Sequence, residues 1–532
     1  MPETGPGAGR CSEKPTYTGL RHPFLVQSEA GRWLVIMGHC RMARYLAAIV
    51  GLAAAGTLGC TSNGPGSCRP RGEEALRAGR VAEGLRPAVA LDGQPPFRFA
   101  LKERLAQLGV PGVSVAVVDG GEIAWAQGYG VRTAGSGAPV TTATLFQAAS
   151  ISKPVAALAA LRLAEQGVLD LDRPVNQQLR TWHLPASMAG SPDEVTPRLL
   201  MTHGAGLSVH GFPGYPHDAP LPGIRRILDG ITPANTEAVR LIQAPGAGWR
   251  YSGGGYTVLQ LLLEDVTGED FAALAERLVL RPLGMRDSTY RQPLPRRLGR
   301  RAARAHDGSG QPVPGGWHVY PEQAAAGLWT TPTDLARFAV AIQQTWGGAP
   351  DAILGPALSR RLLAPHVGAW GLGLSLAADA GALVFGHGGS NEGFRCTMFA
   401  YADRGQGAVV MTNGERGGQL AEEVLRAIAD EYGWPDHRPV TKTAVELAPA
   451  VLATLVGRFT IDGRSTAQVM LDEGVLVLES RSLGRQKLFA ESSETLFTLE
   501  NLEIRLERNE EGRVTALFGS QAGREWKAER EL

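Results

Sequence analysis

The sequence lacks most of the short motifs that mark metal, redox and nucleotide chemistry. Its five cysteines form no CxxC pair, and four of them precede residue 70, so they build neither a disulfide framework nor a zinc site. HExxH, P-loop and strand-linked GxGxxG motifs are also missing. No GxSxG occurs, which excludes the nucleophile elbow of α/β-hydrolases. We therefore expect no metal and no cofactor.

The sequence also lacks an excess of charge of either sign. Lysine and arginine total 53 against 52 aspartates and glutamates, which leaves a formal net charge of +1. A nearly neutral chain has no electrostatic footprint for DNA or RNA, so we expect no nucleic-acid partner. At 532 residues the chain is long enough for more than one domain.

No apolar run reaches the length of a comfortable membrane span. Arg41 and Arg44 precede an apolar stretch at 45–58, which is short and rich in Gly and Ala. It ends at Gly59-Cys60, which resembles a bacterial lipoprotein cleavage site with Cys60 as the lipidated residue, although the two preceding residues depart from the usual pattern. An ordinary secretory signal or an N-terminal anchor is the alternative. We expect an exported protein, periplasmic or at the cell envelope, attached to the membrane if Cys60 is lipidated.

Composition divides the chain into four parts. Residues 1–60 hold the N-terminal extension and the signal-like segment, and residues 61–96, rich in Gly, Pro and Arg, are expected to be a linker. Residues 97–435 mix helical and strand patterns and form the main domain. Short alternating runs with Asp-Gly and Glu-Gly turns over 445–532 predict a C-terminal antiparallel β-domain that resembles a barrel.

The main domain has the element order of an α+β fold. We expect an antiparallel sheet flanked by helices, an α/β sandwich, with an all-helical region inserted between its early and late strands. Thr333 is the expected N-cap of one late helix. The expected strands are 113–118, 122–129, 381–385, 396–400 and 407–411, and the expected helices are 99–108, 153–166, 334–344 and 419–432.

The strongest chemical signal is Ser150-Ile151-Ser152-Lys153 at a helix start. Residues three apart on a helix lie on the same face, which brings the lysine amine to the serine hydroxyl. An amine whose pKa is lowered by burial can take the serine proton and activate the nucleophile. Backbone N–H groups at the helix start can stabilise an oxyanion. A bare SxxK is common by chance, and an N-cap serine with a surface lysine is the alternative.

Further motifs along the chain show that the SxxK is more than a chance match. Their order and spacing resemble the β-lactamase-related serine hydrolases, a family that includes class C β-lactamases, D-Ala-D-Ala carboxypeptidases and certain esterases. The resemblance covers about residues 97–430. The motifs lie at 146–154, 199–207, 249–256, 281–285 and 326–335, followed by the triplet His387-Gly388-Gly389.

The resemblance implies a role for each site residue. Ser150 attacks the acyl carbon, and Lys153 and Tyr251 together carry the serine proton to the leaving group. The 387–389 triplet lines the substrate cleft. Backbone N–H groups of Ser150 and Ser390 form the oxyanion hole.

Two positions depart from the β-lactamase pattern. Gly253 stands where class C β-lactamases carry an asparagine that holds the substrate amide, and His387 stands where a lysine is usual. Histidine is mostly neutral near pH 7, so it binds a substrate carboxylate less firmly than an ammonium does. We expect a serine hydrolase of esters or amides that hydrolyses antibiotics poorly, with β-lactams and D-Ala peptides still among the candidate substrates. His203 is expected to be a structural residue of the cleft wall.

Two alternatives remain. The chain could be a catalytically weak, penicillin-binding-like protein that holds cell-wall peptides, or the β-domain could be the main functional part and bind a small apolar ligand. The presence of Ser150, Lys153 and Tyr251 together favours an enzyme that acts on a small-molecule or peptide substrate.

Overall fold

The computed structural model describes residues 71–379, 381–463, 465–480, 484–521 and 524–531. The signal-like segment and Cys60 lie outside the described residues. Within these ranges, no helix combines the length and apolar character that a membrane crossing requires.

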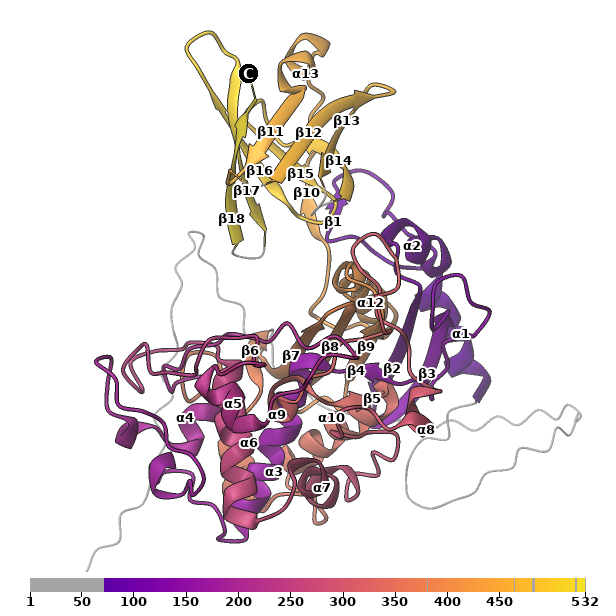
Figure 1. Ribbon diagram of the computed structural model, residues 1–532. Coiled ribbons are helices and arrows are strands. Elements are labelled where there is room, and N and C mark those ends of the chain that lie inside the picture. Colours follow the sequence, from indigo (N-terminus) through magenta and orange to yellow (C-terminus); the bar gives the residue numbers. More distant parts are fainter. Residues whose placement is uncertain (1–70, 380, 464, 481–483, 522–523, 532) are drawn as a thin grey trace, which may run out of the picture. The chain divides into compact units, whose positions relative to one another are not determined.

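A six-stranded sheet forms the centre of the hydrolase domain (Figure 1). Its order is β3-β2-β9-β8-β7-β6, and every neighbouring pair is antiparallel. The strands are β2 (Gly112–Asp119), β3 (Glu122–Gly130), β6 (Ser375–Asp379), β7 (Ala382–Asn391), β8 (Phe394–Tyr401) and β9 (Gly407–Thr412). The five expected strands therefore all join one sheet.

Strand β2 shows why this sheet is covered on both faces. Successive side chains of a strand point to opposite faces, and here both sets are buried and mostly apolar. Val113 and Val115 pack into one core together with α2 (Leu101–Leu108) and α12 (Gly417–Tyr432). Ala116 belongs to the other core, which holds α3 (Ser152–Glu165) and α10 (Pro332–Trp346) (Figure 1). The predicted sandwich of helices around an antiparallel sheet is confirmed.

The inserted helical region lies between β3 and β6 and surrounds α3, whose side chains are buried from its first residue to Leu161. Short helices joined by loops make up most of it, as the Gly/Pro-rich sequence predicts. The helices are α3 (Ser152–Glu165), α4 (Pro197–Met201), α5 (Ile224–Asp229), α6 (Gly253–Thr267), α7 (Phe271–Ala275), α8 (Arg296–Gly299), α9 (Gln323–Ala326), α10 (Pro332–Trp346) and α11 (Pro356–Leu362).

The structure differs from two local expectations. The stretch expected to be a linker includes α1 (Arg71–Ala82) and β1 (Val89–Leu91), and β1 pairs in parallel with β10 (Val440–Lys442). Ala78 of α1 is buried in the core on the α12 face, so this segment is part of the fold despite its Gly and Arg content. The N-cap of α10 is Thr331, whose hydroxyl accepts from Asp334 N at 3.2 Å.

The C-terminal domain is a closed antiparallel barrel of eight strands, which confirms the barrel-like prediction. Alternate residues such as Phe459, Val469 and Leu478 point inward and form its core. A short helix, α13 (Pro449–Leu455), precedes it. The strands are β11 (Gly457–Ile461), β12 (Ser465–Asp472), β13 (Val475–Ser480), β14 (Gly484–Ala490), β15 (Thr495–Thr498), β16 (Glu503–Arg508), β17 (Val514–Gln521) and β18 (Arg524–Arg530).

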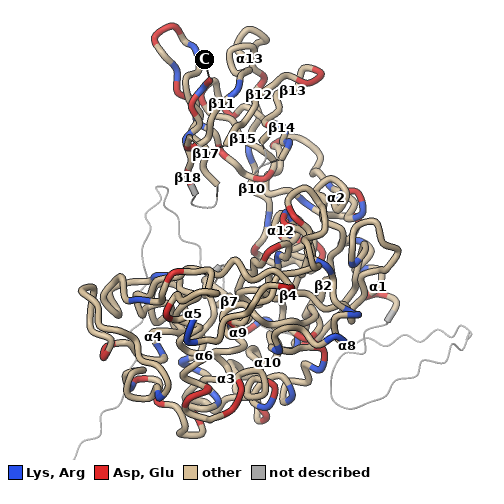
Figure 2. Tube along the Cα trace, in the orientation of Figure 1, with Lys and Arg blue, Asp and Glu red and all other residues tan. Residues whose placement is uncertain are grey.

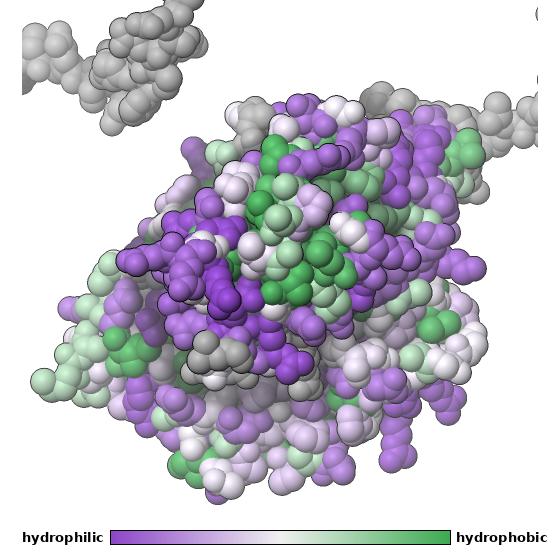
Figure 3. Space-filling view, turned by 90° about the horizontal axis from the view of Figure 1, so that it is seen from above, coloured by the Kyte–Doolittle hydropathy of each residue, from purple (hydrophilic) through white to green (hydrophobic). Residues whose placement is uncertain are grey.

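Charges of both signs are spread along the described chain, as the net charge of +1 leads one to expect (Figure 2). On the face shown in Figure 3, apolar side chains gather near the centre and polar side chains surround them. This face is therefore mixed in character.

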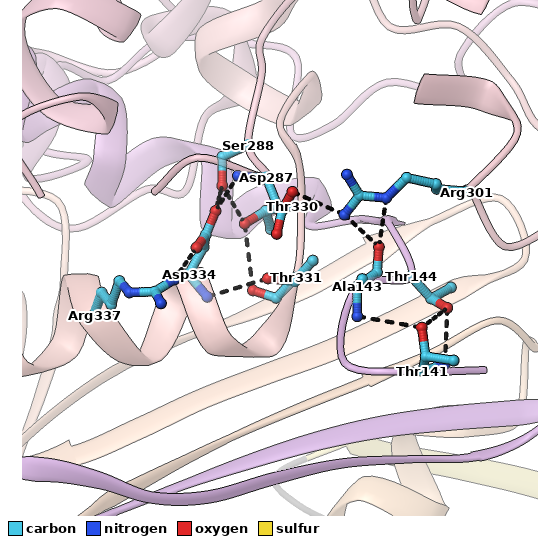
Figure 4. A network of polar contacts seen from close by, with 10 residues as sticks. All are labelled: Thr141, Ala143, Thr144, Asp287, Ser288, Arg301, Thr330, Thr331, Asp334 and Arg337. Atoms are coloured by element: carbon cyan, nitrogen blue, oxygen red, sulfur yellow. Dashed lines mark hydrogen bonds and ion pairs between the residues drawn. The ribbon is translucent and has the colours of Figure 1, made fainter. Parts of the chain in front are cut away.

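A buried carboxylate, Asp334, ties the first turn of α10 to residues 287–288, in the chain that follows α7 (Figure 4). Asp334 is 0% exposed, and one carboxylate oxygen accepts from Asp287 N and Ser288 Oγ, both at 2.8 Å. Its other oxygen accepts from Arg337 at 2.5 Å. These bonds fix the chain next to β5 (Trp329–Thr330), which pairs with β4 (Phe146–Gln147) just before the candidate nucleophile.

Replacement of this carboxylate should destabilise the hydrolase domain. Asp334→Ala leaves the part-buried Asp287 N–H without its acceptor and removes one of the two partners of the Ser288 hydroxyl, which also bonds Thr330 Oγ1, at an expected cost of about 2 kcal/mol in free energy of unfolding. Urea denaturation followed by tryptophan fluorescence measures this loss of stability. The signal reports mainly on the hydrolase domain, because the barrel sequence contains one tryptophan, Trp526. Asp351→Ala, which removes an exposed carboxylate, is the control. Equal midpoints for the two variants would contradict this account.

Candidate active site

Ser150 lies in a tight turn that leads into α3. The turn is a 3-10 segment, Ala149–Ile151, and Ala149 has φ = +51° although it is fully buried. L-residues rarely adopt this left-handed conformation, so the surroundings must hold it. Ser152 does so, because its hydroxyl donates to Ala149 O at 2.5 Å and accepts from Leu328 N at 3.0 Å. The expected serine is thus presented by a constrained backbone.

Lys153 reaches Ser150 as the helical spacing predicts. Its Nζ lies 2.9 Å from Ser150 Oγ and donates to Ala325 O at 2.8 Å. The side chain is 2% exposed, and no ion pair among the described residues includes it. Burial without a carboxylate partner disfavours the charged amine and lowers the pKa of Lys153 to about 7. A substantial fraction of this lysine is therefore neutral near pH 7.

Tyr251 completes the group that the resemblance brought together. Its ring lies 4.9 Å from Lys153 Nζ, and its hydroxyl interacts with the Ser150 side chain. Burial raises the pKa of Tyr251 to about 12, so the phenol keeps its proton at neutral pH. The site therefore holds a near-neutral amine and a protonated phenol beside one hydroxyl.

The triplet lies on β7, directly beside the turn that holds Ser150. A Cβ on Gly389 would stand 2.2 Å from Ala148 O, so only glycine allows this approach. The approach brings the backbone of Gly388 and Ser390 alongside the nucleophile segment. His387 is 7% exposed, and burial, with Lys153 nearby, lowers its pKa to about 3. The histidine in this triplet is therefore uncharged.

Two polar contacts near the site were not foreseen from the sequence. Asn391, at the end of β7, donates to Gln147 Oε1 at 2.8 Å and to Ala326 O at 3.1 Å. These bonds fix β7 to the strand before Ser150 and to α9, which carries the Ala325 carbonyl. Such contacts join segments far apart in sequence, and no local spacing announces them.

Gly253 begins α6, and the space beside it is occupied. A Cβ placed there would lie 3.0 Å from the Phe212 ring and 3.1 Å from His210 O. An asparagine at this position would have to displace that ring. The departure seen in the sequence therefore removes both the side-chain amide and the room for it.

Aromatic rings enclose Tyr251. Its ring centroid lies 4.2 Å from His203 and 6.2 Å from both Trp249 and Trp370. Trp370 is also 5.6 Å from His387, so it spans from the tyrosine to the triplet, and Trp249 is 47% exposed. We call Trp249 and Trp370 the aromatic wall. It gives the surroundings of Tyr251 an apolar character.

The thiol of Cys396 has no place in this chemistry. It is buried on β8 and donates to Gln147 O at 3.2 Å. Burial raises its pKa to about 12, which leaves it protonated and unreactive. In the part of the chain that the structure covers, no three His, Cys, Asp or Glu side chains gather as a metal site would need.

The site combines a serine hydroxyl with a buried amine whose pKa is about 7, a protonated phenol and a closely packed strand. These groups together suit acyl transfer through a serine nucleophile. Comparison with known proteins identifies the family. The Beta-lactamase family model matches residues 97–432, so the chain belongs to the Beta-lactamase family of serine hydrolases. The resemblance drawn from the motifs is confirmed.

Two characterised relatives carry different names. Esterase EstB from Burkholderia gladioli is 35% identical over 223 residues, which cover 41% of this chain and 55% of EstB, so the match spans about half the length of that relative. Penicillin-binding protein 4* from Bacillus subtilis (strain 168) is 25% identical over 425 residues, 74% of this chain and 89% of that protein. The family thus includes both esterases and penicillin-binding proteins.

A solved structure shares the fold. The octameric penicillin-binding protein homologue from Pyrococcus abyssi superposes with a TM-score of 0.54 at 21% identity, over 81% of this chain and 98% of that one. This likeness supports the architecture and carries no information on the substrate.

The lowered pKa of Lys153 predicts the pH dependence of any reaction at Ser150. The neutral amine accepts the serine proton and the ammonium does not, so kcat/KM should rise with pH through a midpoint of about 7 and then level off. The measurement is the initial rate on p-nitrophenyl butyrate from pH 5.5 to 9. Lys153→Met should lower kcat/KM about a thousandfold. A flat profile over this range, or a fully active Lys153→Met, would contradict the assignment.

Proposed function

We propose that this chain is an exported serine esterase that forms an acyl-enzyme on Ser150 and hydrolyses uncharged carboxylic esters. One observation carries the catalytic part of the proposal. Lys153 Nζ stands 2.9 Å from Ser150 Oγ, within a site dry enough to bring the lysine pKa to about 7. A base with a pKa near the working pH is suited to general base catalysis.

The proposed reaction has two halves. Lys153 takes the Ser150 proton as Oγ bonds to the ester carbon, and backbone N–H groups of Ser150 and Ser390 stabilise the oxyanion. The bond from the carbon to the leaving oxygen then breaks, and that oxygen takes up a proton through Tyr251. Water next attacks the acyl-enzyme and gives up a proton to the same pair. The bond from the acyl carbon to Ser150 Oγ then breaks, the carboxylic acid leaves, and Oγ takes a proton back from the pair.

The choice of uncharged esters rests on the charge and space around this group. A substrate carboxylate, as in β-lactams and D-Ala peptides, would find an uncharged His387 where a lysine is usual. An acylamido group would meet Phe212 in place of an asparagine amide. The aromatic wall suits apolar substituents. Each feature favours a neutral, apolar ester.

The alternative of a weak penicillin-binding-like protein that holds cell-wall peptides draws on the likeness to penicillin-binding protein 4*. Such a protein needs firm recognition of anionic peptide ends, and the neutral His387 does not supply it. EstB, an esterase by name, supports the catalytic proposal over its matched region.

The substrate proposal predicts a clear ranking of substrates. kcat/KM for p-nitrophenyl acetate or butyrate should exceed that for nitrocefin by about tenfold or more, since each lost polar contact with the β-lactam is worth about 1 kcal/mol. Ser150→Ala should abolish both activities and labelling by a fluorophosphonate probe. Preference for nitrocefin would overturn the ester assignment. Labelling of Ser150 without turnover of either substrate would favour the binding protein.

Export through the signal-like segment is the remaining part of the proposal. It rests on the apolar run that ends at Gly59-Cys60. Mass spectrometry of the native protein should show a mature N-terminus at a lipidated Cys60, and Cys60→Ser should abolish the lipid mass. An intact and unmodified 45–60 segment in a bacterial host would contradict export by this route.

A further inference from the structure

His203 contacts Tyr251 more closely than a residue of the cleft wall needs to. The histidine is 1% exposed, and its ring centroid lies 4.2 Å from that of the tyrosine. It follows α4 in a left-handed conformation with φ = +58°. Asparagine, aspartate and histidine adopt this conformation more readily than other side chains, but it remains uncommon. The local backbone is therefore held in a specific turn.

In that turn, two acceptor atoms of His203 face the backbone N–H groups of Arg250 and Ser252, the residues on either side of Tyr251. Arg250 N donates to His203 O at 2.8 Å, and Ser252 N donates to His203 Nδ1 at 3.1 Å. The backbone on each side of the tyrosine is thus bonded to the same histidine. Ser252 is also the N-cap of α6, through its hydroxyl and Gly255 N at 2.9 Å, so the clamp is continuous with a rigid helix.

The hydrogen bond also fixes the charge and tautomer of the ring. Nδ1 can accept from Ser252 N only while it carries no proton, so the proton of the neutral ring is on Nε2. Burial, with Lys153, His387 and His210 close by, holds the pKa of His203 well below its usual value. The ring therefore stays neutral, and the clamp stays formed, across the pH range in which Lys153 changes charge.

We propose that His203 is a positioning residue that holds the Tyr251 hydroxyl in line to protonate the leaving group. The inference rests on the proposed function, in which Tyr251 delivers that proton. At 1% exposure His203 has almost no surface that a substrate could contact, and it acts through the backbone of residues 250 and 252 and through ring contact.

The test compares two esters of the same acid whose leaving groups differ in how much they need protonation as they depart. Ethyl butyrate expels an alkoxide, which needs protonation as it leaves, whereas p-nitrophenyl butyrate expels a stabilised phenolate, which needs little. The ratio of the two kcat/KM values on one preparation of the full chain is the readout. It is independent of the fraction of folded enzyme, so a merely structural defect leaves it unchanged.

His203→Phe keeps an aromatic ring and loses the acceptor for Ser252 N. It should lower kcat/KM for ethyl butyrate about a hundredfold, as expected for a misplaced catalytic group, and lower that for p-nitrophenyl butyrate far less. His203→Asn keeps an acceptor and tolerates the left-handed turn, so it should recover most of the loss. His203→Phe combined with Tyr251→Phe should be no worse than Tyr251→Phe alone.

The outcomes separate this inference from the function on which it rests. Equal losses on both esters, or no loss on either, in His203→Phe would overturn the positioning role while ester hydrolysis by the unsubstituted chain stood. A further loss in the double variant beyond Tyr251→Phe would also overturn it. An unsubstituted chain that hydrolyses neither ester would refute the proposed function instead.

Discussion

Lys153 has been taken out of water without a carboxylate beside it, and the rest of the site depends on that constraint. An ammonium in such surroundings is costly, so the group gives up its proton near pH 7. The same burial keeps Tyr251 protonated and His387 neutral. One physical cause thus separates the pKa values of three neighbouring groups and assigns each a protonation state.

Excluding water from the Lys153 amine requires close packing of backbone against backbone. Small residues make this possible: Gly389 allows β7 to pass Ala148, and the buried, alanine-rich α3 lets neighbouring segments approach. In place of a charged partner, Lys153 meets the Ala325 carbonyl, which accepts a hydrogen bond from either protonation state of the amine. A carboxylate at that point would have favoured the ammonium and removed the base.

The sequence predicts the parts of this site that follow from local geometry. Ser150 and Lys153 meet because three residues on a helix return to one face, and the alternating strands of both domains follow from their period of two. Ala325, Asn391 and the clamp at His203 depend on contacts between distant segments, so spacing alone does not reveal them. The α1 segment was missed because Gly and Arg outnumber its few buried residues, and a linker has the same composition.

The relatives show why the fold leaves the substrate open. An esterase and a penicillin-binding protein both match this chain, so the nucleophile and its base are compatible with either activity. The distinction must come from groups that contact the rest of the substrate. Here His387 carries no charge, because burial, with Lys153 nearby, lowers its pKa to about 3. A cation in its place would disfavour the ammonium form of Lys153 and lower the pKa of that amine further, so it would leave the proposed base in being. The charge at residue 387 and the proposed base can therefore vary independently within the family.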